Sequence, residues 1–472
     1  MKRILSVKTI EKIGDEVKLA GWVHNRRDHG KIIFIDLRDK KGLTQLVFLP
    51  DNKDCYKLAN SLRNEWVIEI IGQVNKRPNG MINDKIPTGE VEIEVKELKI
   101  LNEAKTTPFE IAEYKEVGEE VRLKYRYLDL RRQKMKDNLI LRHKIIKLIR
   151  DFMDRKGFIE VETPILTKST PEGARDFLVP THFNLGEFYA LPQAPQQLKQ
   201  LLMVAGLEKY FQIARCFRDE DLRGNRQPEF TQLDVEMSFI NEKNVMNLIE
   251  KLLIKTIQEL VVFDEKLSKK LTFKPFLKLD YKEAMEKYGT DSPDLREDKK
   301  DPHELAFVWI VNFPLFEWND EEKRYDPCHH IFTAPKKEHI PLLSTKPLKV
   351  FSRQYDLVLN GVEIGGGSIR IHQKDIQEKI FELVGLTKEE IKDKFGHLLE
   401  AFEYGAPPHG GIALGLDRLI SMFLNERSIR EVIAFPKTGD GRDLMMDAPS
   451  KVDSKQLDEL GIKLHPKDIK QC

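Results

Sequence analysis

The segment from Asp356 to Arg370, DLVLNGVEIGGGSIR, constrains the fold of this chain more than any other. Asn-Gly between two apolar runs is a strong short-range signal for a two-residue hairpin turn. The expected register pairs Leu359 with Val362, Val358 with Glu363, and Leu357 with Ile364. Because strand side chains alternate in direction, Asp356 and Glu363 should be diagonal neighbours on one sheet face, within reach of a bridging cation.

The three glycines after Glu363 leave the backbone bare, so a ligand can approach it closely. Together with the two carboxylates and Arg370, they predict a Mg²⁺–polyphosphate site built on a sheet. A solvated surface hairpin is the alternative. Strict alternation from Glu363 places Arg370 on the opposite face, so either the glycine run contains a bulge or Arg370 serves another surface.

The length of 472 residues is too great for one hydrophobic core and predicts two or three domains. No apolar run approaches membrane-spanning length, and the first residues lack the apolar stretch of a secretion signal. The four cysteines contain no CxxC pair and are expected to be reduced thiols: Cys55, Cys216, Cys328 and Cys472. These features predict a cytoplasmic protein without a membrane partner.

Residues 1–103 carry the pattern of an all-β domain. Five strands are expected at 17–25, 31–38, 43–49, 65–74 and 91–100, with a short helix at about 54–62. Five strands with a helix after the third is the order of an OB-fold barrel. Basic residues outnumber acidic ones in the first 41 residues, which suits a nucleic-acid partner, although a solvated charged surface is the alternative.

A polar stretch, residues 104–137, is expected to be a hinge. Residues 138–156 show helical spacing of apolar side chains, with Gly157 as the stop. Strands and helices alternate from there to about residue 450, which predicts one α+β domain with a polar loop near 286–304. Residues 451–472 are expected to form a tail.

Two further segments carry chemistry on expected strands. Phe211–Glu220 and Glu229–Asp234 form a second predicted hairpin, with Arg218 and Glu220 on one face of its first strand. Pro407–Ile420 leads through glycines into a helix whose first turn contains Arg418, and helix starts favour anions. Arg218, Arg370 and Arg418 thus stand in three separate turn-flanked contexts, which suits a polyphosphate ligand.

These segments carry a family resemblance. FRDED, GLDRL and GFIEVETP resemble motifs 2, 3 and 1 of the class II aminoacyl-tRNA synthetases. TPEGARDF, QAPQQLK, RQPEFTQLD and VEIGGGSIRIH resemble the bacterial aspartyl-tRNA synthetases, and the likeness runs across nearly the whole chain. It implies an anticodon-binding OB-fold barrel and a catalytic domain with an antiparallel sheet, acting on L-aspartate, ATP and tRNA-Asp.

The resemblance implies contacts to ATP from ten residues: Arg218, Asp219, Glu220, Gln227, Phe230, Glu363, Gly415, Leu416, Asp417 and Arg418. Within this set, Arg218 would hold the α-phosphate and the aspartate carboxylate. Phe230 and Arg418 would cover the two faces of adenine, and Arg218 and Arg418 would be the catalytic residues. The acidic pair Asp356 and Glu363 would hold Mg²⁺, in agreement with the hairpin geometry.

The implied aspartate pocket consists of Gln196, Lys199, Arg218, Asp234 and Arg370, with Glu172 and His409 closing over it. Selecting aspartate over asparagine needs cations at the side-chain carboxylate, and Lys199 and Arg370 would supply them. Each charge-assisted hydrogen bond contributes about 1.5–3 kcal/mol. Ala194 stands where the family pattern leads us to expect a serine.

Phe34 should lie on the barrel face opposite Ile33, Ile35 and Leu37, where an aromatic ring can stack on a nucleobase. Its alternative place is a second core. By resemblance, Arg27, Phe34 and Gln45 would read the anticodon. His29 resembles family members that charge both tRNA-Asp and tRNA-Asn, which implies a non-discriminating enzyme.

A second departure from the family pattern and three rival functions bear on this interpretation. Bacterial members usually carry an extra domain between motifs 2 and 3, where this chain has only the stretch near 286–304. Rival functions are a class II enzyme for asparagine or lysine, an adenylate-forming asparagine synthetase, and a non-catalytic nucleic-acid-binding relative. The helix at 138–156 and the strand near Pro164 resemble the class II dimer motif, which implies a homodimer.

Overall fold

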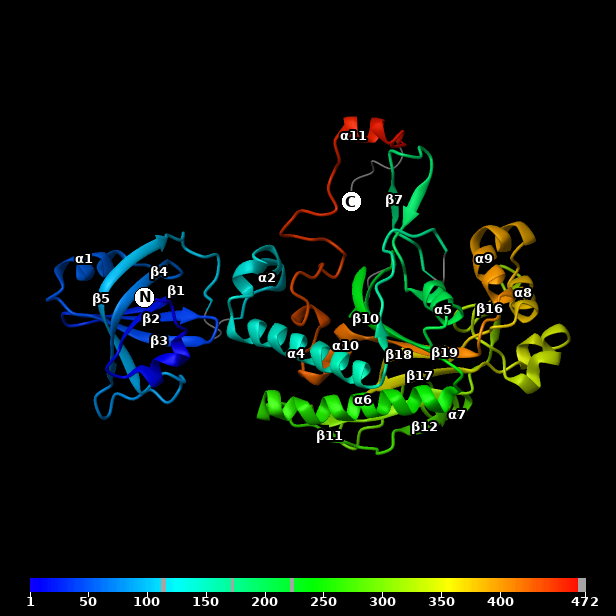
Figure 1. Cartoon of the computed structure of the whole chain (residues 1–472), viewed down its shortest axis with the longest axis horizontal. Coiled ribbons are helices and arrows are strands. Elements are labelled where there is room, and N and C mark those ends of the chain that lie inside the picture. The colour runs from blue at the N-terminus through cyan, green and yellow to red at the C-terminus, as the bar shows by residue number, and fades with distance from the viewer. Residues whose placement is uncertain (112–115, 171–173, 221–224, 466–472) are drawn as a thin grey trace. The chain divides into compact units, whose positions relative to one another are not determined.

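The computed structural model describes residues 1–111, 116–170, 174–220 and 225–465. The chain divides into two compact units, Met1–Lys115 and Glu116–Cys472, which Figure 1 draws in one view. Each unit has its own hydrophobic core. No helix in the described ranges is long and apolar enough to cross a membrane.

The first unit is a closed five-stranded barrel in the order β1-β2-β3-β5-β4, which confirms the predicted OB-fold. Its elements follow the expected order: β1 Glu16–His29, β2 Ile32–Asp39, β3 Gly42–Phe48, α1 Lys53–Ser61, β4 Val67–Lys76 and β5 Val91–Asn102. Alternation along β2 sends Ile33, Ile35 and Leu37 into the core. Phe34 is half-buried and lies on the opposite face.

The second unit is built on an eight-stranded sheet in the order β12-β14-β17-β18-β19-β10-β9-β6. Its strands are β12 Leu277–Asp280, β14 Phe307–Val311, β17 Gln354–Leu359, β18 Val362–Ile369, β19 His409–Gly415, β10 Glu229–Ser238, β9 Lys209–Phe217 and β6 Ile159–Glu160. The six central strands are antiparallel, but β12 and β6 pair in parallel at the two edges. The antiparallel sheet that the sequence predicts is therefore present in the six central strands, and a parallel strand at each edge makes the whole sheet mixed.

Helices α4 (Gln133–Arg155) and α6 (Glu242–Phe263) pack side by side against one face of the sheet (Figure 1). Their apolar side chains share a core with the sheet; Ile145 and Ile149 of α4 are almost fully buried in it. Gly157, with φ +75°, follows the end of α4 in a conformation that favours glycine. The opposite sheet face carries α5 (Gln196–Val204). Helix α10 (Leu416–Phe423) follows β19 directly and packs its apolar side chains into the core shared by α4 and α6.

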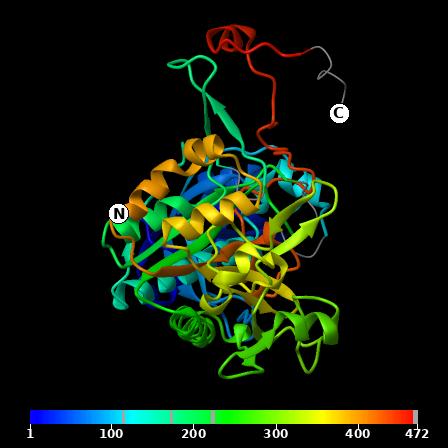
Figure 2. The ribbon, with the colours of Figure 1, turned by 90° about the vertical axis from the view of Figure 1, so that its right-hand side faces the viewer.

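The remaining elements are short or peripheral. They are η1 Ser6–Lys12, α2 Glu119–Lys124, α3 Arg126–Asp129, β7 Leu178–Pro180, β8 Phe188–Ala190, η2 Glu265–Leu267, β11 Lys270–Leu271, α7 Tyr281–Tyr288, β13 Glu304–Leu305, β15 Phe316–Asn319, β16 Arg324–Pro327, η3 Lys337–Ser344, η4 Pro347–Lys349, α8 Lys374–Leu383, α9 Lys388–Glu403, η5 Ile429–Glu431 and α11 Ser454–Glu459. Figure 2 shows the β7–β8 hairpin and the segment with α11 projecting from the body of the second unit.

The β17–β18 hairpin turns at Asn360-Gly361 as the sequence predicts, and Val358 pairs with Glu363. The expected pairing of Leu357 with Ile364 is wrong, because Leu357 pairs with Gly365 and the register shifts by one residue. This bulge lies one residue before the glycine run. The bulge places Arg370 on the same face as Asp356 and Glu363. The chain therefore has the expected bulge, one residue before the glycine run, and Arg370 does not serve another surface.

The two faces of β2 differ sharply, and a pair of neighbouring substitutions tests them. Ile35 is fully buried in the barrel core, so Ile35→Ala should cost about 2–5 kcal/mol of barrel stability. Phe34→Ala, one residue away, should cost less than about 1 kcal/mol because its ring lies outside that core. Hydrogen exchange of barrel peptides in the full chain measures both; equal losses would contradict the assignment of faces.

Candidate active site

One cavity of about 470 Å³ opens over β10, β18 and β19, and α5 and α10 contribute to its wall. Arg218, Arg370 and Arg418, predicted from three separate segments, all line it. Other predicted residues in the lining are Gln196, Lys199, Glu220, Gln227, Phe230, Asp234, Glu363, Gly415 and Asp417. Residues far apart in the sequence therefore share one concave site.

One end of the cavity is rich in guanidinium groups, and we call it the arginine end. It comprises Arg218, Arg226, Phe230 and Arg418. The Arg218 guanidinium lies 5.2 Å from the centre of the Phe230 ring. Arg418 donates to the backbone carbonyl of Glu363. Burial lowers the pKa of Arg418. The positive charges of Arg226 and Arg218 also lower it, whereas the negative charge of Glu363 raises it. These groups suit an anionic ligand.

The other end is a buried charge cluster, and we call it the lysine end. It comprises Lys199, Asp234, Glu236 and Arg370. Lys199 Nζ lies 2.7 Å from Asp234 Oδ1 and 3.4 Å from Glu236 Oε2. Arg370 grips Glu236 through Nε and Nη2 at 3.0 and 3.1 Å. Phe230 and Asp234 are four residues apart on β10, which separates the two ends by roughly 13 Å.

The pKa values of the two acids of the lysine end are shifted in opposite directions. Burial raises the pKa of Asp234, although Lys199 opposes the shift. Burial also acts to raise the pKa of Glu236, but Arg370 and Lys199 outweigh it and hold the pKa below its ordinary value. Oδ2 of Asp234 is buried, and no hydrogen-bond partner reaches it from the described part of the chain. That oxygen can accept a bond from a ligand.

Sequence reasoning missed Glu236 and the adjacent histidines His329 and His330. The two histidines line the cavity, and Glu236 binds Arg370 beside it. Glu236 stands two residues after Asp234, so strand alternation could have found it. His330 Nε2 lies 2.6 Å from Arg370 Nη1. Burial lowers the pKa of His329 to about 3 and that of His330 well below its ordinary range, so both rings are neutral at pH 7. The consecutive histidines were the available signal.

Asp356 and Glu363 lie on one face of the β17–β18 hairpin. A Cβ at Gly366 would come within 2.8 Å of Asp356 Oδ1, so only glycine leaves room for that oxygen. Glu363 and Gly366 line the cavity, whereas Asp356 lies behind them and does not. Oδ1 is buried and lacks a hydrogen-bond partner among the described residues. Burial, and next the charge of Glu363, raises the pKa of Asp356 well above its ordinary value.

The donor set of this acidic pair fits Mg²⁺. Hard carboxylate oxygens suit the ion, which uses one or two carboxylates and completes its shell with water and phosphate. Within the described residues, no group of three or more His, Cys, Asp or Glu side chains forms a self-sufficient metal site. The pair could therefore hold Mg²⁺ only with oxygens of a ligand or of water.

Several predicted residues have their polar groups engaged within the protein. Gln227 bonds both ends of its amide to the Lys437 backbone, and the carboxylate of Asp417 meets Arg142 and the Thr231 amide. His409 is buried against Pro407 and Gln200 and does not line the cavity. Leu416 belongs to the hydrophobic core, and Asp219 bridges to the Arg175 backbone. Glu172 lies outside the described residues.

In the barrel, Arg27, Phe34 and Gln45 share the outer face of neighbouring strands. Arg27 pairs with Phe34 in the β1–β2 register, and its guanidinium lies 2.8 Å from Asp36 and 3.4 Å from Gln45. Gln45 in turn donates to Glu92 at 3.0 Å. His29 is exposed at the last position of β1. An aromatic ring beside hydrogen-bonding groups is a suitable surface for a single-stranded nucleic acid.

Comparison with known proteins agrees with this geometry. The family model of tRNA synthetases class II (D, K and N) matches residues 118–439, and that of the OB-fold nucleic acid binding domain matches residues 17–101. A Dictyoglomus turgidum protein named aspartate–tRNA(Asp/Asn) ligase is 46% identical over 98% of both chains. A Rubrobacter xylanophilus protein of the same name is 44% identical, covering 96% of this chain and 95% of the relative.

Solved structures share the fold. The aspartyl-tRNA synthetase of Entamoeba histolytica has a TM-score of 0.74 at 22% identity, covering 92% of this chain and 91% of that one. The asparaginyl-tRNA synthetase of Pyrococcus horikoshii has a TM-score of 0.73 at 23% identity, with 91% and 96% covered. The Dictyoglomus alignment spans 585 positions, so more than a hundred of them have no residue of this 472-residue chain.

The raised pKa of Asp356 generates a prediction about stability. The Asp356 carboxyl group binds its proton more tightly in the folded protein than in the unfolded chain. Ionised Asp356 therefore destabilises the fold, and this destabilisation increases as pH rises from about 4. Asp356→Asn should therefore raise the unfolding temperature at pH 8 more than at pH 5, since an unpartnered buried oxygen costs about 1–3 kcal/mol. Thermal unfolding without nucleotide or Mg²⁺ measures this. The control is Asp151→Asn on the exposed face of α4, which should show no such pH dependence; identical behaviour of the two variants would contradict the assignment.

Proposed function

The chain belongs to the class II tRNA synthetases of the D, K and N group, and we propose that it joins L-aspartate to tRNA-Asp at the expense of ATP. The observation that carries this proposal is the single cavity with an arginine end and a lysine end. A nucleotide and a small charged amino acid can lie there end to end. The names of the relatives at 44–46% identity support the same activity.

In the proposed first step, the α-carboxylate of aspartate attacks the α-phosphate of ATP. A C–O–P anhydride forms, pyrophosphate leaves, and the tRNA terminal hydroxyl later displaces AMP. Negative charge gathers on the phosphate, so Arg218 and Arg418 provide alignment and electrostatic stabilisation without a protein nucleophile. Phe230 offers a flat surface for the adenine ring. Mg²⁺ held by Asp356 and Glu363 would neutralise phosphate charge when bound.

Aspartate is the proposed amino acid because the lysine end offers two cationic donors for the side-chain carboxylate and an acceptor for the ammonium group. Arg370 has five N–H donors, and contacts to Glu236, His330 and Ser368 use four of them. One remains for the side-chain carboxylate, together with the Lys199 ammonium. The unpartnered Oδ2 of Asp234 can accept from the substrate ammonium. An asparagine amide would leave the cations poorly satisfied. Glu172 and His409 are proposed to close over this end, which His409 would have to do from its buried position beside Gln200.

The barrel is the proposed anticodon-binding domain, with Phe34 stacking on a base and Arg27 and Gln45 reading its edges. We also propose that the enzyme charges tRNA-Asn. His29 lies exposed at the end of β1, and the bacterial relatives carry the name aspartate–tRNA(Asp/Asn) ligase. Such a product, Asp-tRNA-Asn, would need later amidation by another enzyme.

A homodimer and a cytoplasmic location complete the proposal. Ile159, Ile165 and Leu166, which follow α4, are each about half exposed (48%, 48% and 52%). Exposed aliphatic side chains clustered in one short segment are typical of a subunit interface. The expected dimer would bury them.

Aspartate-dependent exchange of pyrophosphate into ATP, followed by charging of purified tRNA-Asp, tests the function. Arg218→Lys should lower the exchange rate about 10²–10³-fold, because a lysine lacks the planar fork that stabilises the phosphoryl transition state. Arg150→Lys, on the exposed face of α4, is the control and should keep the wild-type rate. Exchange supported by asparagine or lysine instead of aspartate would overturn the proposal, and exchange without charging would indicate a small-molecule ligase.

The role of His29 has its own test. His29→Leu should lower kcat/KM for tRNA-Asn by about tenfold and leave tRNA-Asp within twofold, since one lost base contact is worth about 1–3 kcal/mol. Lys31→Ala, across the same turn, is the control; loss of a phosphate contact should weaken both tRNAs alike. If the wild-type protein fails to charge tRNA-Asn transcripts, the dual specificity is refuted.

A further inference from the structure

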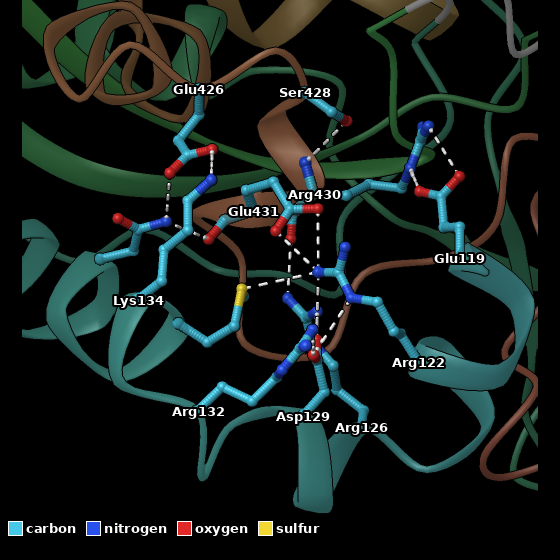
Figure 3. A network of polar contacts seen from close by, with 12 residues as sticks. Glu119, Arg122, Arg126, Asp129, Arg132, Lys134, Glu426, Ser428, Arg430 and Glu431 are labelled. Atoms are coloured by element: carbon cyan, nitrogen blue, oxygen red, sulfur yellow. Dashed lines mark hydrogen bonds and ion pairs between the residues drawn. The ribbon is translucent and has the colours of Figure 1, made fainter. Parts of the chain in front are cut away.

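The segment that follows α10, residues 425–434, runs beside the arginine end of the cavity, and we call it the strap. It contains only a short 3-10 helix, η5, so its backbone depends on side chains from elsewhere. Those side chains come from α2, α3, α4 and the turns between them. Figure 3 shows the guanidinium groups of Arg122, Arg126 and Arg132 converging on the carboxylate of Asp129 close to Glu431.

Arg126 is the centre of this arrangement and is only 2% exposed. Its Nε donates to the carbonyl of Ala434 at 2.9 Å, and its Nη2 donates to the carbonyls of Arg430 and Ile433 at 2.8 and 2.9 Å. Its Nη1 lies 2.6 Å from Asp129, which is fully buried and balances the charge. One side chain therefore fixes three carbonyls of the strap in a defined arrangement.

Helix α4 holds the same backbone from a second side. Asn138 donates to the Glu431 carbonyl at 3.1 Å and to the Glu426 carboxylate at 2.9 Å. Arg142 donates to the Val432 carbonyl at 3.2 Å. Arg126 and Asn138 thus hold adjacent parts of one segment, and substitution of either should loosen it.

The strap meets the cavity through Ile429, which is 3% exposed and lines it beside Asn225, Arg226 and Arg418. The side chain of Asn225 donates to the Arg427 carbonyl at 3.3 Å, which joins the strap to the loop that carries Arg226. The lysine end is built instead from α5, β10 and the end of β18. A displaced strap should therefore disturb the arginine end and spare the lysine end.

We propose that Arg126 is a positioning residue for nucleotide binding, which acts by fixing the strap and through it the Ile429–Asn225 wall of the cavity. The proposal rests on the function proposed above. Arg126 makes no contact with the cavity itself and is therefore not a catalytic residue. Its substitution should affect ATP and aspartate unequally, because the two substrates are expected at opposite ends.

The test is aspartate-dependent pyrophosphate exchange by the full chain, with KM measured for each substrate. Arg126→Lys should raise KM for ATP about ten- to a hundredfold, since a lysine cannot hold three carbonyls and small misplacements at a site are costly. KM for aspartate should change less than threefold. Asn138→Ala should move KM for ATP in the same direction by a smaller factor, and it provides the test if Arg126→Lys fails to fold.

The matched control is Arg353→Lys, which removes another bidentate arginine of the same unit. Arg353 grips Glu242 at 2.7 and 2.8 Å and does not line the cavity. It should lower the unfolding temperature without separating the two KM values. Equal changes of both KM values in the Arg126 or Asn138 variants, or no change in either, would overturn the inference. Absence of exchange in the wild-type protein would instead refute the proposed function.

Discussion

The buried charge cluster on β10 is the interaction on which the rest of the site depends. Asp234 and Glu236 project from one face of a central strand, and Lys199 and Arg370 reach them from α5 and the end of β18. Four ionised groups removed from water cost several kcal/mol each unless geometry and further hydrogen bonds compensate them. Lys199 meets both acids and Arg370 grips Glu236 with two donors, so the charges balance. Such a cluster is a weak source of stability, but it fixes how α5, β10 and the end of β18 meet.

Much of this architecture could be predicted because it follows local periodicity. Alternation places Ile35 inside and Phe34 outside the barrel, and Asn360-Gly361 sets the central hairpin. A bulge was one of the two alternatives that the sequence left open, but its position at Ile364 could not be predicted, since Gly-Gly-Gly has no side-chain pattern to fix its register. Long-range hydrogen bonds could not be predicted either. The side-chain amide of Gln227, for example, bonds to the backbone of Lys437, 210 residues away. Residue type and spacing predict that the arginines share one cavity, but they do not show which polar side chains form hydrogen bonds within the protein.

The chain is shorter than its bacterial relatives, and the structure indicates how the remaining loop closes on itself. Glu304 of β13 accepts the backbone amides of Glu297 and Asp298, and Arg296 folds back onto Asp294. Asp294 in turn packs against Gly361 at the tip of the β17–β18 hairpin, where a Cβ would lie 3.2 Å from it. The polar loop thus satisfies its own hydrogen bonds and covers the hairpin turn. A loop of this kind preserves the strand pair that carries Asp356 and Glu363 without a further domain.

The arginine end carries several positive charges, and the neighbouring β17–β18 hairpin carries two acidic side chains. Together they favour a polyphosphate ligand with a divalent cation. Burial lowers the pKa of Arg418, and repulsion by Arg226 and Arg218 adds to this shift; burial, and next the charge of Glu363, raises the pKa of Asp356 on the neighbouring hairpin. The charge of Glu363 offsets that of Arg418 only in part, because Arg418 donates to the Glu363 backbone carbonyl while Oδ1 of Asp356 is buried behind Gly366. A polyphosphate would relieve the first repulsion and a divalent cation the second. Since phosphate oxygens complete the coordination of Mg²⁺, each would bind better in the presence of the other. In the proposed function, the two strands of the hairpin would therefore link binding of the metal to binding of the nucleotide.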